Sequence, residues 1–207
     1  MRLMNLAAAL VLLVSPTEAR AQAGASHSKW ITSAVMAHNS FSGASRDAVS
    51  FPGAVVSFQP GDHLGVSLGI ARRFGAWELG LGLGYLTTNL AIEGNGANIR
   101  DDTEPWRRLR VELLGARRLI HLGQGGLALA AGPTLDSWET GSFDGNLVVG
   151  GRIQLSLVLP LGSRFAVENR ASMGWSPSPF TENDTPAGVE RKTLRTLELG
   201  AGFRVRL

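Results

Sequence analysis

The chain has 207 residues, contains no Cys, and carries 20 basic against 17 acidic side chains. This length accommodates one domain of ordinary size, and the lack of Cys excludes both a disulfide-stapled fold and a lipid-modified N-terminal Cys. Basic residues never exceed two in a row after the N-terminal segment, so we expect no nucleic-acid partner.

The N-terminus predicts a cleaved secretory signal peptide over residues 1–23. Arg2 supplies the positive charge, residues 6–14 form an uninterrupted apolar run, and Ser15-Pro16 ends it. Small residues for a cleavage site follow at Ala19, Ala21 and Ala23. The apolar run is too short to span a bilayer, which takes about 20 residues. We therefore expect export, and a mature domain over residues 24–207.

Beyond residue 23, apolar residues alternate with polar or small ones, a period typical of β-strands. In residues 77–85, a Trp, three Leu and a Tyr share one face, and Glu78 with three Gly occupies the other. The same period recurs at residues 63–74, 108–120, 147–159, 165–175 and 197–207. Two further strands are expected at residues 30–38 and at residues 127–135, the second of which is apolar on both faces, and this makes eight strands. Residues 55–58 are an alternative part of the first strand. Pro133 cannot donate a ladder hydrogen bond, so the fifth strand requires a bulge there or a position above the lipid.

The connections alternate between short and long. Short ones lie at residues 74–76, 121–126 and 160–163, and longer polar ones at residues 93–105, 136–145 and 176–190. Transmembrane barrels have short periplasmic turns and longer extracellular loops. The pattern therefore predicts an all-β fold: an antiparallel up-and-down transmembrane β-barrel of eight strands.

Charged side chains lie in the middle of the polar faces. In a closed barrel, ion pairs across the interior compensate such charges. The predicted interior charges are Glu78, Arg110, Glu112, Arg152, Glu168, Arg170, Glu198 and Arg204.

Aromatic residues bracket the apolar faces. Trp77 and Tyr85 lie eight residues apart on one face, and Phe165 and Trp175 lie ten apart. These separations project to about 20 and 25 Å along a membrane normal, close to the height of about 25 Å between the aromatic girdles of such barrels. The arginines at residues 72, 73, 117, 118 and 164 lie at the short-turn end, where we expect them to reach anionic headgroups.

The segment Gly202 to Leu207 resembles the C-terminal β-signal of outer-membrane barrels. A Gly is followed by hydrophobic residues at alternating positions, and Leu207 stands where an aromatic is usual. The mature chain is similar to the small eight-stranded OmpA/OmpX type of outer-membrane barrel. This resemblance implies a location in the cell outer membrane, contact with outer-membrane lipids and lipopolysaccharide, and recognition by the barrel assembly machinery through Gly202 to Leu207.

No catalytic residue, cofactor or metal site is predicted. The four His residues show no metal-ligand spacing with another His or a carboxylate. His38-Asn39-Ser40 resembles the His-x-Ser element of lipid A deacylase barrels, but the next acid, Asp47, lies in a predicted loop. Asp101-Asp102 resembles the acidic pair of barrel proteases, whose partner residues are missing. We interpret both as solvated polar groups.

The expected role is structural or surface-interactive, with an interior plugged by polar and charged side chains, and not enzymatic. Three alternatives stay open. One is a lipid-modifying enzyme that uses His38, and another is a narrow pore. The third is a soluble periplasmic barrel that binds an apolar ligand, in which Leu81, Leu155 and Phe203 point inward. The sequence does not indicate an oligomeric state.

Overall fold

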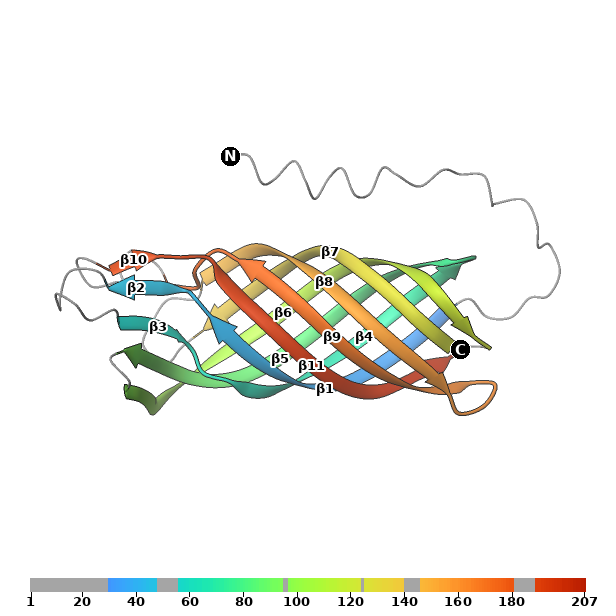
Figure 1. Ribbon diagram of the computed structural model, residues 1–207, viewed down its shortest axis with the longest axis horizontal. Coiled ribbons are helices and arrows are strands. Elements are labelled where there is room, and N and C mark those ends of the chain that lie inside the picture. Colours follow the sequence, from blue (N-terminus) through green and yellow to red (C-terminus); the bar gives the residue numbers. More distant parts are fainter. Residues whose placement is uncertain (1–29, 48–55, 95–96, 124, 140–145, 181–188) are drawn as a thin grey trace.

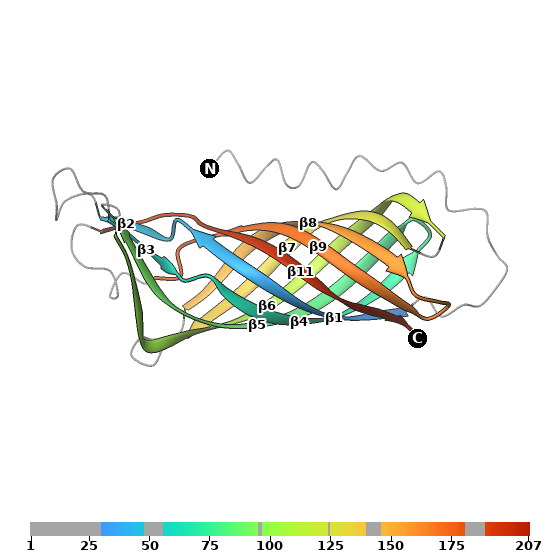
Figure 2. The same cartoon turned by 60° about the horizontal axis from the view of Figure 1, so that its bottom comes forward.

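The computed structural model describes residues 30–47, 56–94, 97–123, 125–139, 146–180 and 189–207. The predicted signal peptide, residues 1–23, lies outside these ranges. None of the described residues forms a helix long and apolar enough to cross a membrane. Eight long strands run obliquely around a common axis (Figures 1 and 2). They are β1 (Trp30–Ser42), β4 (His63–Phe74), β5 (Trp77–Gly94), β6 (Ala97–Leu122), β7 (Gly125–Glu139), β8 (Asn146–Pro160), β9 (Phe165–Ser176) and β11 (Leu194–Arg206).

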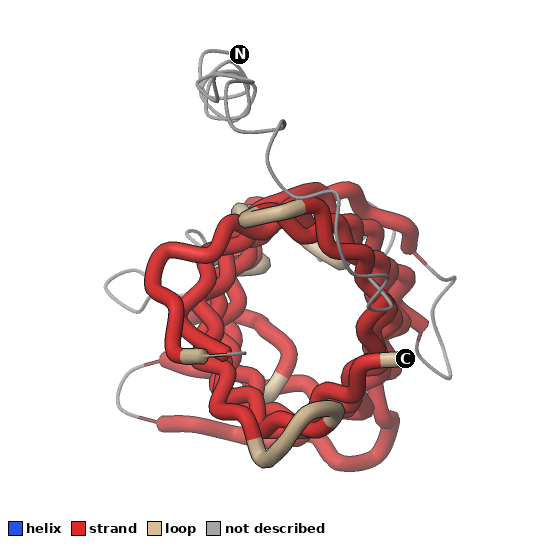
Figure 3. The backbone as a smooth tube through the Cα atoms, turned by 90° about the vertical axis from the view of Figure 1, so that its right-hand side faces the viewer, coloured by secondary structure: helices blue, strands red, loops and turns tan. Residues whose placement is uncertain are grey.

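The eight strands close into a barrel. Each one pairs antiparallel with the next along the chain, and β1 pairs with β11, from Ile31 opposite Arg206 to Ser42 opposite Arg195. The view along the axis shows the resulting ring (Figure 3). The predicted eight-stranded antiparallel barrel is therefore confirmed.

The two ends of the barrel differ. At the end that holds the C-terminus, here called the turn end, β4 and β5 are joined by Gly75 and Ala76, and Gly75 has a φ of 64° that suits glycine. At the opposite end, the loop end, three short strands extend the sheet (Figure 1). These are β2 (Ser45–Asp47), β3 (Val56–Pro60) and β10 (Val189–Arg191), in the order β10-β2-β3-β5.

Parts of two predicted loops are in fact strands. Residues 93–94 belong to β5 and residues 97–105 to β6, and beyond a register shift between Thr88 and Leu90 the two strands pair again, from Leu90 opposite Asp101 to Gly94 opposite Ala97. Residues 136–139 are the end of β7. Strands that pair outside an apolar layer need no apolar face. The sequence of these strand ends therefore shows no period of two. Residues 56–58 belong to β3, which pairs with β2 and β5 and is not part of the first strand.

Apolar side chains face outward along the barrel wall, and charged ones face inward. Leu81, Leu155 and Phe203 are 53%, 42% and 59% exposed, whereas Arg152 and Glu198 are 3% and 4% exposed. A soluble barrel with an apolar interior requires the opposite arrangement. The structure therefore rules out the alternative in which these three apolar residues line a ligand cavity.

Pro133 lies in the middle of β7, and no bulge forms there. The β6–β7 pairing runs to Glu112 opposite Thr134 and resumes in the same register at Gly115 opposite Ala131. The ladder is interrupted beside Pro133 and Gly132, where Pro133 has no N–H to donate.

We predict that Gly132→Ala destabilises the barrel. A Cβ at Gly132 would lie 1.9 Å from the carbonyl oxygen of Leu113, so β6 and β7 must separate. The expected loss is about 1–3 kcal/mol, as for other overpacked sites. A urea titration of the protein in detergent measures it.

Gly115→Ala is the matched control on the facing strand, because the nearest atom to its Cβ, the carbonyl oxygen of Ala131, is 3.9 Å away. Equal midpoints for the two variants would contradict the close approach at Gly132.

Candidate functional site

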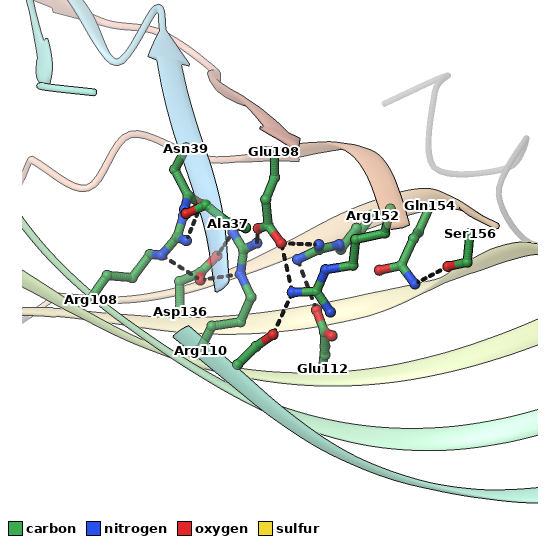
Figure 4. Close-up of polar contacts among 12 residues, drawn as sticks. Ala37, Asn39, Arg108, Arg110, Glu112, Asp136, Arg152, Gln154, Ser156 and Glu198 are labelled. Carbon is green, nitrogen blue, oxygen red and sulfur yellow. Dashed lines mark hydrogen bonds and ion pairs between the residues drawn. The ribbon is translucent and has the colours of Figure 1, made fainter. Parts of the chain in front are cut away.

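The barrel interior holds a group of buried charges, here called the central charge cluster (Figure 4). Its members come from five strands and converge on the axis. They are Arg108, Arg110 and Glu112 of β6, Asp136 of β7, Arg152 of β8, Arg170 of β9, and Glu198 of β11.

Glu198 is the acceptor that joins most of this cluster. Its Oε1 accepts hydrogen bonds from Arg152 Nη2 at 2.6 Å and from Arg170 Nη2 at 2.8 Å. Its Oε2 lies 3.8 Å from Arg110 Nη1. One carboxylate thus contacts guanidinium groups from three strands. Such charge-assisted bonds offset part of the large desolvation cost of burying these ions.

Two further carboxylates complete the pairing. Glu112 Oε2 accepts a hydrogen bond from Arg152 Nη1 at 3.0 Å. Asp136 binds the guanidinium of Arg110 with both oxygens, at 2.7 and 3.2 Å. Asp136 was expected in an exposed loop, but its side chain is buried inside the barrel. The correction follows from the extension of β7, which carries residue 136 onto the inner wall.

A second group, the turn-end charge cluster, lies nearer the C-terminus. Glu78 Oε1 accepts hydrogen bonds from Arg73 Nη2 at 2.7 Å and from Arg118 Nη2 at 3.4 Å. Glu78 Oε2 accepts one from Arg204 Nη2 at 2.6 Å. Arg204 also lies 3.7 Å from Glu168. Arg73 and Arg118 therefore point toward Glu78, whereas sequence analysis placed them among the lipid headgroups.

Aromatic residues fill the interior at the loop end. Phe41, Trp106, Trp138 and Phe180 are buried and pack edge to face, with ring centroids 5.0 to 6.2 Å apart. Arg108 lies beneath them, 5.3 and 5.5 Å from the ring centroids of Phe41 and Trp138. We call these four residues the loop-end aromatic cluster. Sequence analysis missed it because all four residues lie outside the predicted strands, just before or after them.

The structure places all eight of the residues singled out as interior charges on the inner wall. Seven are buried, and Arg204 is partly buried. Five of the eight belong to the central charge cluster: Arg110, Glu112, Arg152 and Glu198 pair with one another, and Arg170 pairs with Glu198. The other three, Glu78, Glu168 and Arg204, belong to the turn-end charge cluster. The four residues singled out as an aromatic girdle, Trp77, Tyr85, Phe165 and Trp175, are exposed on the outer wall.

A polar group lies on the outer wall near the loop end. Ser40 Oγ lies 3.4 Å from His38 Nε2 and donates a hydrogen bond to Asp62 Oδ2 at 3.0 Å. Sequence analysis missed Asp62, which precedes β4 and reaches β1 only through strand pairing. In a Ser-His-Asp relay the carboxylate binds the second ring nitrogen of the His, whereas here it binds the Ser and the backbone N–H of Phe41.

The described residues contain no group of three or more His, Asp and Glu side chains arranged to hold a metal ion. The charged groups described in the interior are arginines and carboxylates that pair with one another.

No protein-family model matches this sequence, and no curated protein resembles it significantly in sequence. Solved structures do match the fold. Neisserial surface protein A aligns with a TM-score of 0.56 and 13% identity over 88% of this chain and 100% of that one. The outer membrane protein AlkL, solved in lipid bilayers, aligns with a TM-score of 0.51 and 14% identity over 90% and 94%. The fold is that of a small outer-membrane β-barrel. The central charge cluster lies inside this barrel.

We predict that Glu198→Gln destabilises the barrel more than Glu168→Gln. Loss of the Glu198 charge removes the described carboxylate partner of Arg170 and leaves Arg152 with Glu112 alone, and breaking a buried ion pair costs about 3–5 kcal/mol. Loss of Glu168 leaves Arg204 still bonded to Glu78, so we expect less than about 2 kcal/mol.

Both side chains are buried, so the pair controls for burial. Urea midpoints of the two variants measure the difference. Equal loss of stability in the two variants would contradict the prediction, because it would show that the number of guanidinium groups around each carboxylate does not set its contribution.

Proposed function

We propose that this protein is an outer-membrane barrel with a closed interior and a structural or surface-interaction role. The observation that carries the proposal is the inversion of the barrel wall, with apolar side chains outside and ion pairs inside. Burial of apolar surface is favourable, and a continuous apolar belt around a barrel finds an apolar partner in lipid. A barrel also satisfies all its backbone polar groups in lipid, since it has no open edge.

The turn-end rim supports a membrane boundary at that level. Arg72 stacks on the rings of Trp30 and Phe74, at 5.6 and 5.2 Å, and Arg117 stacks on Trp77 at 5.7 Å. Aromatic residues favour the headgroup layer of a membrane, and arginines in that layer contact anionic headgroups. We propose outer-membrane lipids and lipopolysaccharide as the partners of the outer wall.

The closed interior rests on the two charge clusters and the loop-end aromatic cluster. Eight strands leave an interior just wide enough for side chains to fill. The inner side chains from several strands meet at the axis at hydrogen-bonding distance. This arrangement favours a plugged barrel over the narrow-pore alternative.

We further propose that residues 1–23 direct export and that Gly202 to Leu207 bind the barrel assembly machinery. Residues 202–206 belong to β11, the strand that closes the barrel against β1. The names of the two structural neighbours, a surface protein and an outer membrane protein, agree with this location. The proposed role is not enzymatic and needs no cofactor.

Envelope fractionation tests the proposal. We expect the protein in the outer-membrane fraction, with a gel band that shifts on boiling because the folded barrel resists detergent at room temperature. A soluble periplasmic band without a shift would contradict the membrane location. Purified into planar bilayers, the same protein should give no conductance steps, and regular steps would contradict the closed interior while leaving the location intact.

One observation favours a second candidate function, ester hydrolysis at the membrane surface. Ser40, His38 and Asp62 lie together on the outer wall, and His38 pairs in register with Leu64 and Leu199, which are exposed to the apolar layer. A Ser beside a His is the arrangement that nucleophilic catalysis requires. Its substrates would be ester-linked acyl chains of envelope lipids.

An assay of fatty-acid release tests this candidate, with Ser40→Ala as the variant and Ser42→Ala as its control. Ser42 is an exposed serine on the same face of β1. If this function exists, the purified protein releases fatty acid from lipopolysaccharide or phospholipid vesicles, and only Ser40→Ala abolishes the release. No release by the unmodified protein ends this candidate, and equal loss in both variants assigns the effect to the strand rather than to Ser40.

A further inference from the structure

The central charge cluster is not neutral. Its described members are four arginines and three carboxylates, which leaves one positive charge in excess. Isolated buried charges are among the most costly features of a protein interior. The excess therefore calls for a negative partner that the described side chains do not supply.

The excess charge is located at Arg108. Asp136 and Glu198 are already hydrogen-bonded to Arg110, Arg152 and Arg170. Arg108 donates one hydrogen bond, from Nη2 to Asn39 Oδ1 at 3.0 Å, and its Nε lies 3.8 Å from Asp136, beyond hydrogen-bonding distance. Neither its Nε nor its Nη1 has a hydrogen-bond acceptor among the described residues, although both atoms are buried. The rings of Phe41 and Trp138 supply only a weak interaction with the cation.

A cavity of about 20 Å³ lies beside this arginine. Its lining includes Arg108, Arg110, Arg152, Arg170, Glu112 and Glu198. This volume exceeds the roughly 10–15 Å³ that a water-sized particle requires. Four of the six charged groups around the space are cationic, so an anion is favoured there over a cation.

The opposite wall of the cavity is built from small residues. Gly65, Ser67 and Gly84, on the paired strands β4 and β5, line it together with Ala37 of β1. A Cβ at Gly65 would lie 3.1 Å from Asn39 Nδ2, within the space next to the partner of Arg108. Small residues in these positions keep room for a group that is not part of the chain.

We propose that the barrel binds one small monovalent anion, of the size of chloride, between Arg108 and the small-residue wall of β1, β4 and β5. The anion neutralises the excess charge and accepts hydrogen bonds from the free N–H groups of Arg108. It is a structural counter-ion of the closed barrel and stabilises the folded state only.

Anion-dependent unfolding of the purified full-length protein in detergent tests this proposal. The chloride concentration of the buffer is raised in place of gluconate, so that the ionic strength stays constant. Gluconate is too large for the cavity. The unfolding temperature should rise with the logarithm of the chloride concentration above the Kd, by about 3–6 °C at ten times the Kd. Arg108→Gln should abolish the rise, because it removes the excess charge. Arg107→Gln, the exposed neighbour on the outer face of β6, should keep it.

A second measurement does not depend on the fold of any variant. Line broadening of the bromide NMR signal by the unmodified protein should be larger when folded than after unfolding in urea, and chloride should reverse it. A rise in the unfolding temperature that is linear in chloride concentration, equal chloride dependence in both variants, or no broadening beyond that of empty micelles would each overturn the proposal. In those cases the cavity holds water only.

Discussion

The pairing of β1 with β11 is the constraint on which the rest of the molecule depends. It turns a sheet with two open edges into a ring, and it leaves no row of unpaired N–H and C=O groups along the wall. Closure also separates the side chains into two environments with no exchange between them. Every second residue faces the outside, and the others meet within a space that eight strands make narrow.

This narrowness explains the composition of the inner wall. Long charged side chains from β6, β8, β9 and β11 reach across the axis, whereas β4 and β5 contribute mostly small residues. Gly82 pairs with Glu112 on the neighbouring strand, and a Cβ at Gly82 would lie 2.7 Å from the Glu112 side chain, which occupies the space above this glycine. Long and small residues are therefore complementary on the inner wall, and the alternation of Gly with Leu in β5 serves both the packing inside and the apolar layer outside.

Much of this architecture follows from the sequence. A period of two identifies six of the eight strands and the faces of their residues, because the side-chain direction in a strand is a local property. Which charges meet is not local, since Glu198 and Arg152 are brought together only by the register of several intervening strands. The sequence also hid Asp136, Trp106 and Trp138, because strand pairing at the loop end continues where the apolar alternation stops. Asp62 escaped notice for the same reason, as it meets Ser40 across a strand pair and not along the chain.

The continuation of β5 and β6 past the barrel sets how far this end of the protein extends from the barrel wall. Beyond the register shift, five consecutive residue pairs join the two strands, from Leu90 opposite Asp101 to Gly94 opposite Ala97, which corresponds to about 15 Å along the strand. A ribbon held by cross-strand bonds bends less than an unpaired loop of equal length. A partner that contacts the Gly94–Ala97 end is therefore held at a set distance from the barrel, and a shorter or longer ribbon would change that distance without altering the barrel below.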